Sequence, residues 1–318
     1  MSKTKMWLLI AASLVVTGCL IFGGVMMVLK WDFLKLSTDR YVKNVYRVDQ
    51  PFTNITIDAD TADLTFAVSK DGQCRVESVE REDARNEVTV LRDTLRVKHI
   101  SGPWYKQIGF NFQTPKITVY LPQTEYTALK IQQSTGDVKL PENMRFSEVD
   151  ITVSTGDVTV YASSLERMSV ETSTGDIHLS GLSAGELDLT VTTGRVTVND
   201  VKSKGDVKLQ VSTGKAKLED VTCKNLTTNG STGDITLDSV IAEEKFTITR
   251  TTGDVKFEGA DAGGILVQTD TGDVTGTFLT GKYYHINTDT GKVDVPANTQ
   301  GTRCEVRTST GNIKLRIQ

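Results

Sequence analysis

The sequence predicts an all-β protein: a single-chain β-solenoid of about ten coils, each 19–20 residues long, behind one N-terminal transmembrane helix. Three observations support this fold class. A Thr-Gly turn recurs at a near-constant interval, apolar and polar residues alternate on both sides of each turn, and an uncharged stretch lies near the N-terminus. Alternation with a period of two residues indicates strands that bury one face.

The uncharged N-terminal stretch comprises residues 6–29. As a helix of 24 residues, rising about 1.5 Å per residue, it would reach roughly 36 Å and span a hydrocarbon core of about 30 Å with some tilt. Lys3 and Lys5 precede it, and Trp31 lies where an interfacial aromatic anchor is expected. We therefore expect residues 1–30 to form a short tail and an uncleaved anchor that contacts the lipid bilayer.

Two alternatives to an uncleaved anchor stay open. One is a cleaved secretory signal, whose apolar core is usually shorter. The other is a lipoprotein signal, because Val16-Thr17-Gly18-Cys19 resembles a lipobox, although residues 20–29 stay apolar where lipoproteins usually become polar. The flanking basic residues would place the large domain in the cytoplasm, but long domains are translocated largely regardless of charge. We expect a single-pass cell-membrane protein with an extracytoplasmic solenoid.

The repeated turn has the pattern Ser/Thr/Asp-Thr-Gly and occurs ten times, with successive glycines 19 or 20 residues apart. Apolar residues follow each glycine by two and four positions and precede it by five and seven, with few exceptions. Glycine is required if the chain takes a positive φ to pass sharply from one strand to the next. The ten glycines are Gly136, Gly156, Gly175, Gly194, Gly214, Gly233, Gly253, Gly272, Gly291 and Gly311.

A stack is favoured over ten independent hairpins. One repeat buries about four apolar side chains, worth roughly 8 kcal/mol at about 2 kcal/mol each. Ordering about 20 residues costs on the order of 20–40 kcal/mol. A single repeat therefore cannot fold alone, whereas stacking joins the cores and pairs every strand on both sides. At about 4.8 Å per coil, ten coils predict a rod of roughly 48 Å.

The repeats occupy residues 129–318. We expect residues 31–50 to be a juxtamembrane linker and residues 51–128 to be an irregular β segment that caps the solenoid. Within that segment, Asp60-Thr61-Ala62-Asp63 has apolar neighbours at the repeat offsets and predicts a diverged coil, residues 88–97 predict a hairpin, and residues 116–121 predict a strand.

Aromatic residues, only 7% of the chain, gather at residues 102–112. We expect a loop that packs over the first coil there; a contact with a partner or membrane is the alternative.

Six aspartates follow turn glycines and should form a column about 4.8 Å apart. We interpret them as carboxylates that accept hydrogen bonds from backbone N–H groups of their own turns. The alternative is calcium held between coils, which carboxylate oxygens would coordinate. Arg195 and Lys215 interrupt the column and are expected to balance Asp176 and Asp234. The six are Asp137, Asp157, Asp176, Asp234, Asp254 and Asp273.

Composition and motifs argue against several classes of function. The net charge of -4 and the interspersed charges do not suit nucleic-acid binding. The four cysteines show no metal spacing, and Cys304 occupies an apolar repeat position. None of the common catalytic motifs occurs, and His178 alternates with core positions, so it should point outward. We expect no catalytic residue, no cofactor and no enzyme.

Ser-Thr-Gly-Asp-Val begins at Ser134 and Ser154, and Ser-Thr-Gly-Asp-Ile begins at Ser231. These repeats behind an apolar helix resemble the bacterial putative adhesin family of unknown function over roughly residues 50–318. The resemblance implies a β-solenoid and a cell-envelope location, in some members linked to envelope stress. The first hypothesis is a non-enzymatic scaffold that binds an envelope protein or glycan. The alternatives are self-association into an end-to-end polymer, and a carbohydrate-active enzyme using the aspartate column.

Overall fold

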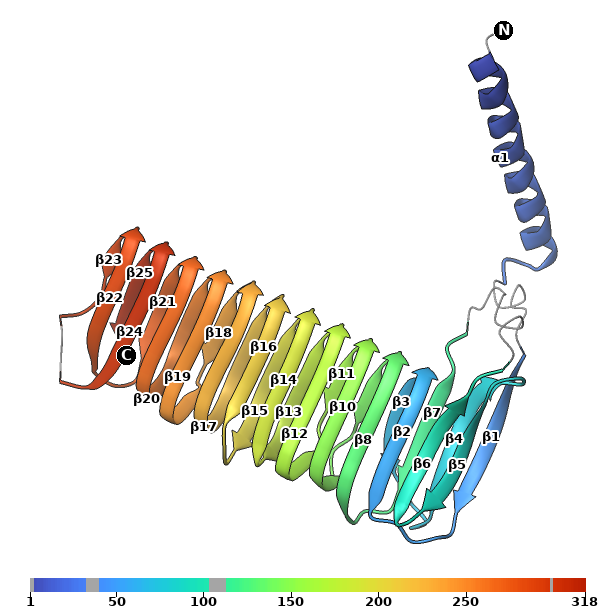
Figure 1. Ribbon diagram of the computed structural model, residues 1–318, viewed down its shortest axis with the longest axis horizontal. Helices are drawn as coiled ribbons and strands as arrows, with labels where there is room; N and C mark the ends of the chain where they lie inside the picture. Colours follow the sequence, from blue (N-terminus) through green and yellow to red (C-terminus); the bar gives the residue numbers. More distant parts are fainter. Residues whose placement is uncertain (1–2, 33–39, 103–112, 298–299) are drawn as a thin grey trace.

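The computed structural model describes residues 3–32, 40–102, 113–297 and 300–318. It confirms the predicted class: parallel coils of short strands stack into a rod, and one helix lies at the N-terminus (Figure 1). All 25 described strands belong to one continuous hydrogen-bonded sheet.

The helix α1 (Lys3–Val28) is 26 residues long and apolar on all sides. An 18-residue stretch within Thr4–Val28 has a mean hydropathy of 2.4 and is not buried in the protein. By length and composition, α1 could therefore cross a membrane.

A cap of antiparallel strands precedes the coils. It contains β1 (Tyr41–Val48), β4 (Cys74–Arg81), β5 (Arg85–Leu91), β6 (Thr94–Ile100) and β7 (Lys116–Leu121). β4 lies between β1 and β7, and β5 forms the predicted hairpin with β6. β1 corrects one expectation, because its eight residues fall in the segment predicted to be a linker. The predicted aromatic loop falls largely at residues 103–112, outside the described residues.

The first coil is the diverged repeat that the sequence predicts upstream. Its strands are β2 (Asn54–Thr61) and β3 (Asp63–Val68). Ile57 pairs with Ile131 and Leu64 with Val138 of the next coil, so the repeat offsets hold. On their other edges β2 and β3 pair in parallel with β6 and β7, which joins the cap to the solenoid.

The regular coils continue the same register. Ile151, Val170 and Leu189, for example, are direct neighbours in successive coils, and all three are buried. The strands are β8 (Glu125–Thr135), β9 (Val138–Leu140), β10 (Arg145–Thr155), β11 (Val158–Val160), β12 (Ser163–Thr174), β13 (Ile177–Ala184), β14 (Glu186–Thr193), β15 (Val196–Ser203), β16 (Val207–Thr213), β17 (Ala216–Thr232), β18 (Ile235–Asp238), β19 (Ile241–Thr252), β20 (Val255–Thr271), β21 (Val274–Phe278), β22 (Lys282–Thr290), β23 (Val293–Asp294), β24 (Thr302–Thr310) and β25 (Ile313–Ile317).

Glycine is required at the turns for two reasons: the backbone takes a positive φ there, and the backbones of neighbouring coils approach each other closely. Gly175 has a φ of 143°, which L side chains rarely adopt. A Cβ there would lie 2.0 Å from the backbone oxygen of Gly156 in the preceding coil. The absence of a side chain at this position therefore allows the turns of successive coils to stack.

The last two coils are out of sequence order, which corrects the expectation that each repeat adds the next rung. β24 pairs with β20 on one edge and with β22 on the other (Figure 1). The C-terminal coil is therefore inserted in the stack between the coil of β20 and the coil of β22, although β22 comes before β24 in the chain. The inner coil contributes Cys304, Val306 and Leu315, all fully buried, whereas the outer coil leaves Val293 49% exposed. An inner coil must fill the core on both sides, which compact apolar side chains do best.

Candidate functional site

Exposed threonines form an uninterrupted line along one edge of the solenoid, which we call the turn edge. Each lies directly before a turn glycine, or before Ala62 in the first coil, and pairs in register with the threonine of the neighbouring coil. Their backbone carbonyls accept hydrogen bonds from turn glycines, as in Gly156 N to Thr174 O at 2.9 Å. The turn edge comprises Thr61, Thr135, Thr155, Thr174, Thr193, Thr213, Thr232, Thr252, Thr271, Thr290 and Thr310.

The aspartate column lies beside the turn edge and connects neighbouring coils. The Asp157 N–H donates to Asp137 Oδ1 at 2.9 Å, and the Asp176 N–H donates to Asp157 Oδ1 at 2.8 Å. Asp234, Asp254 and Asp273 repeat the arrangement further along. The expectation that each carboxylate binds its own turn is therefore wrong: at a rung spacing of about 4.8 Å the side chain reaches the N–H of the next coil instead.

The two basic residues in the column pair with their predicted partners. Lys215 Nζ lies 2.9 Å from Asp234 Oδ2, and Arg195 Nη1 lies 4.0 Å from Asp176 Oδ2. The hydrogen bond from Lys215, with that from the Asp254 backbone, lowers the pKa of the Asp234 carboxyl below its usual range. Like-charge repulsion along the column is therefore relieved near its centre.

In the part of the chain that the structure describes, no three or more His, Cys, Asp or Glu side chains group where they could hold a metal ion. Calcium favours six to eight oxygen ligands. In the column, Oδ1 of each of the six aspartates already accepts a backbone hydrogen bond. Calcium between coils stays a hypothesis that would use the remaining oxygens.

The other residues singled out in the sequence do not gather at one place. His178 stays on the outer face of β13, where its ring meets Tyr161 edge-on at 6.1 Å. Cys304 is fully buried, and burial raises the pKa of its thiol to about 12. It is therefore a small core residue, as the repeat pattern predicts.

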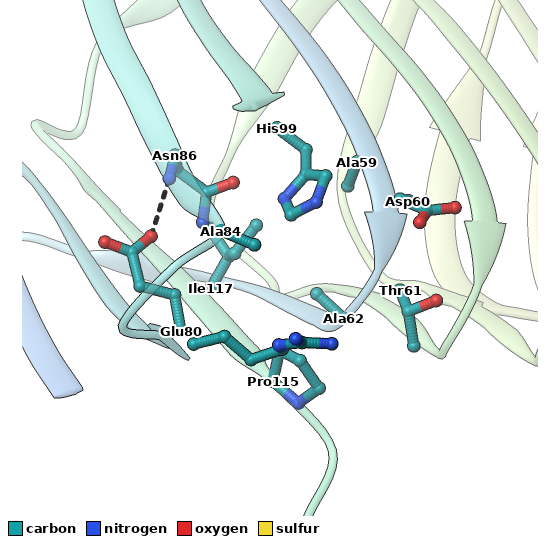
Figure 2. Close-up of a pocket in the computed structure, with 11 residues that line it drawn as sticks. Ala59, Asp60, Thr61, Ala62, Glu80, Ala84, Asn86, His99, Pro115 and Ile117 are labelled. Atoms are coloured by element: carbon teal, nitrogen blue, oxygen red, sulfur yellow. Dashed lines mark hydrogen bonds between the residues drawn. The ribbon is translucent and has the colours of Figure 1, made fainter. Parts of the chain in front are cut away.

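A small cavity lies where the cap meets the first coil (Figure 2). Its volume is about 190 Å³. β2, β4, β5, β6 and β7 contribute to its wall, so it joins segments far apart in the sequence. Its lining residues are Ala59, Asp60, Thr61, Ala62, Glu80, Arg81, Ala84, Asn86, His99, Pro115 and Ile117.

Glu80, only 2% exposed, organises one wall of this cavity. Oε1 accepts hydrogen bonds from Asn44 Nδ2 at 2.6 Å and from the Tyr46 hydroxyl at 2.7 Å. Oε2 accepts from Ser78 Oγ at 3.0 Å and from the Asn86 backbone N–H at 2.7 Å. Burial, together with the Glu80 carboxylate, raises the pKa of Tyr46 to about 12. Four donors thus fix the carboxylate inside the cap.

Sequence reasoning did not find this cavity. Glu80 and Asn86 lie in a polar stretch, residues 80–87, that reads as a solvated surface. The one available signal was polar residues at alternating positions of β4: Ser78 and Glu80 share the buried face with Val76. Nothing in the spacing indicates that β2 and β5 meet there.

Comparison with known proteins identifies the family of this chain. The chain belongs to the Toastrack DUF4097 family, whose model matches residues 52–212 and 202–318. No curated protein matches the chain in sequence.

Similar solved structures include a putative adhesin of Bacteroides fragilis, 17% identical, with a TM-score of 0.41 over 87% of this chain and 97% of that one. A putative adhesin of Parabacteroides distasonis is 12% identical, with a TM-score of 0.46 over 88% and 98% of the two chains. A putative lipid-binding protein of the same species is 9% identical, with a TM-score of 0.45 over 87% and 96%.

Proposed function

We propose that this protein is a non-enzymatic, membrane-anchored scaffold of the cell envelope that binds an extended glycan along its turn edge. The observation that carries the proposal is the line of exposed threonines, one in every coil, in register from Thr61 to Thr290. A surface that repeats with each coil suits a ligand that also repeats.

The energetics favour a long ligand. One hydroxyl contact contributes about 0.5–1.5 kcal/mol net, whereas association costs at least about 4 kcal/mol. At about 1 kcal/mol per contact, four contacts only offset that cost, so contacts along five or more coils are needed before binding becomes favourable, and each further coil adds to it. Hydroxyl groups both donate and accept hydrogen bonds, which matches the alcohol groups of a polysaccharide.

The anchor sets where such binding takes place. α1 is long and apolar enough to cross a bilayer, and we place the solenoid on the outer side of the membrane, within reach of envelope glycans. Protease treatment of intact cells tests this placement. Digestion of the solenoid without lysis supports it, and full protection until lysis contradicts it.

Binding is tested with the full-length chain in lipid nanodiscs and insoluble envelope glycan in a pull-down. The variant carries Thr193→Ala, Thr213→Ala and Thr232→Ala on the turn edge. The matched control carries Thr152→Ala, Thr190→Ala and Thr249→Ala, which point outward from the broad wall formed by β10, β14 and β19. Binding lost only in the turn-edge variant supports the proposal. Equal binding by both variants, or release of shortened glycan, contradicts it.

An end-to-end polymer is a second candidate, favoured by the open end of the rod. Among the described strands, β22 and β23 are each paired on one edge only, by β24 and β25. Unpaired strand edges favour association with another chain. Light scattering should then show mass rising with concentration, and a constant monomer mass would exclude this candidate.

A further inference from the structure

We propose that the buried ion pair of Lys282 and Asp261 condenses to an amide bond, which cross-links two coils at the C-terminal end of the rod. Three observations carry this inference: the two side chains are in direct contact, they are buried away from water, and neighbouring polar groups hold them in place. The cross-link is a modification of the chain itself, so it is independent of the turn edge and of any ligand bound there.

The two groups that would react are already in contact. Lys282 Nζ donates a hydrogen bond to Asp261 Oδ1. Because Oδ1 is bonded to Cγ, this contact places the nitrogen beside the carbon atom that it would attack. Well-oriented groups within one molecule react as if present at on the order of 10⁵–10⁸ M. The fold therefore replaces a separate enzyme in bringing the amine and the carboxyl group together.

Both side chains lie in a site from which water is excluded. Lys282 is fully buried and Asp261 is 8% exposed. Nζ lies 5.8 Å from the centroid of the Phe278 ring, and the buried rings of Phe278 and Phe257 have centroids 5.0 Å apart. Two charges are costly to keep in such a place, and condensation replaces them by a neutral amide. The exclusion of water also protects that amide from hydrolysis.

Neighbouring groups fix the orientation of both partners. The Ala262 backbone N–H donates to Asp261 Oδ1 at 2.8 Å and would stabilise negative charge on this oxygen as the nitrogen adds to Cγ. Lys282 Nζ donates to Thr302 Oγ1 at 2.7 Å and to Thr280 Oγ1 at 2.9 Å. Within the described residues, Asp261 Oδ2 is buried without a hydrogen-bond partner. Oδ1 is therefore held as the future amide oxygen, and Oδ2 is the oxygen that can leave.

The condensation balances without any added reagent. The Lys282 ammonium group first passes a proton to the Asp261 carboxylate, which gives a neutral amine and a carboxylic acid. The amine electron pair then forms the Nζ–Cγ bond, and the Cγ–Oδ2 bond breaks. Oδ2 leaves as water with two of the three ammonium protons, and the third proton stays on the amide nitrogen. The Thr302 hydroxyl, hydrogen-bonded to Nζ, is placed to relay a proton during this step. Nothing is oxidised or reduced.

The bond would span the inserted C-terminal coil. Lys282 is the first residue of β22, and β24 lies between β22 and β20, the strand that carries Asp261. Among the described strands, β22 is paired on one edge only, so hydrogen bonds to β24 hold the outer coil in place. An amide between Lys282 and Asp261 would tie the outer coil to the coil of β20 and prevent the open end from fraying.

Peptide mapping of the full-length chain, purified from membranes and unfolded in urea before digestion, tests the cross-link. Trypsin cleaves after Lys and Arg, and neither occurs between Lys256 and Lys282, so both partners fall on one tryptic peptide. Trypsin does not cleave after a lysine whose amine has become an amide. The expected product is the peptide 257–292, lighter than its sequence by one water molecule, and its fragment ions should place the link between Asp261 and Lys282.

Two variants and one internal control accompany the measurement. Lys282→Met yields the same peptide, 257–292, and it should have its full mass. Asp261→Ala should restore cleavage after Lys282. The internal control is the ion pair of Lys217 and Glu219, whose charged atoms lie 2.6 Å apart while the side chains are 48% and 40% exposed. Water stabilises these charges, so trypsin should cleave after Lys217 completely.

Complete cleavage after Lys282 in the unmodified chain would overturn the proposal. So would a missing water molecule that maps to another residue, or one that persists on this peptide in Asp261→Ala. These readouts do not require the variants to fold, because the decisive comparison is made on digested chains.

Discussion

Replacing Gly175 by alanine tests how the coils are held together. The new Cβ would lie 2.0 Å from the backbone oxygen of Gly156, and a φ of 143° is strained for any residue with a side chain. Backbone strain of this kind costs about 1–3 kcal/mol, and overpacking against a backbone atom that cannot rotate away adds about 1–3 kcal/mol. We therefore expect Gly175→Ala to destabilise the stack by roughly 2–6 kcal/mol.

Gly181→Ala is the matched control. Gly181 also has a positive φ, 64°, but a Cβ there meets nothing within 4 Å, so only strain of about 1–2 kcal/mol is expected. Urea unfolding followed by circular dichroism compares the two variants. Amide hydrogen exchange locates the weakened region, which should centre on β10 and β12, because a solenoid is stabilised by neighbouring coils. Equal destabilisation by the two alanines would refute direct contact between the turns.

Three further predictions concern buried and paired groups. Lys215 lowers the folded-state pKa of Asp234, so the stability that this pair contributes is present above the unfolded pKa and is lost as pH falls through the folded pKa. Replacing Asp234 by Asn should therefore flatten the fall of the thermal midpoint below about pH 4. An unchanged profile of thermal midpoint against pH would contradict the pairing. Burial raises the thiol pKa of Cys74 and Cys223 to about 12. A maleimide should therefore modify these two thiols only after unfolding, which mass spectrometry would detect. Rapid labelling of both thiols in the native protein would exclude their burial. Lys282 is fully buried and forms an ion pair with Asp261. Lys282→Met should therefore lower the free energy of unfolding by about 3–5 kcal/mol and speed hydrogen exchange in β22, and the double variant with Asp261→Asn should recover part of that stability. No recovery in the double variant would mean that the two charges are not coupled.

The repeat could be predicted from the sequence because one physical requirement recurs in every coil. Two inward side chains precede and two follow a turn that carries glycine in every coil after the first, so the spacing of Gly136, Gly156 and Gly175 predicts the strands and their register together. The diverged first coil was found by the same offsets around Ala62.

The order of the last coils could not be predicted in that way. The segments around Gly291 and Gly311 both carry the repeat, so either could pair with β20, and the choice depends on which side chains fill a closed core and which tolerate an open end. The partner of each aspartate was mistaken for a similar reason: the distance between coils, rather than the local turn, decides which N–H the side chain reaches. The cavity is lined jointly by residues of β2, β4 and β5, and no repeated signal in the sequence predicts that these strands surround one space.

Distances along the turn edge test the stacked ladder most directly. Spin labels on the full-length chain at Thr155 and, in turn, Thr252, Thr310 and Thr290 can be measured by double electron–electron resonance, with Cys19→Ser as background. These sites are five, seven and eight rungs from Thr155, so at about 4.8 Å per rung the backbone separations should be roughly 24, 34 and 38 Å. A shorter distance to Thr290 than to Thr310 would contradict the inserted last coil, and distances that fail to grow with rung number would contradict the solenoid itself.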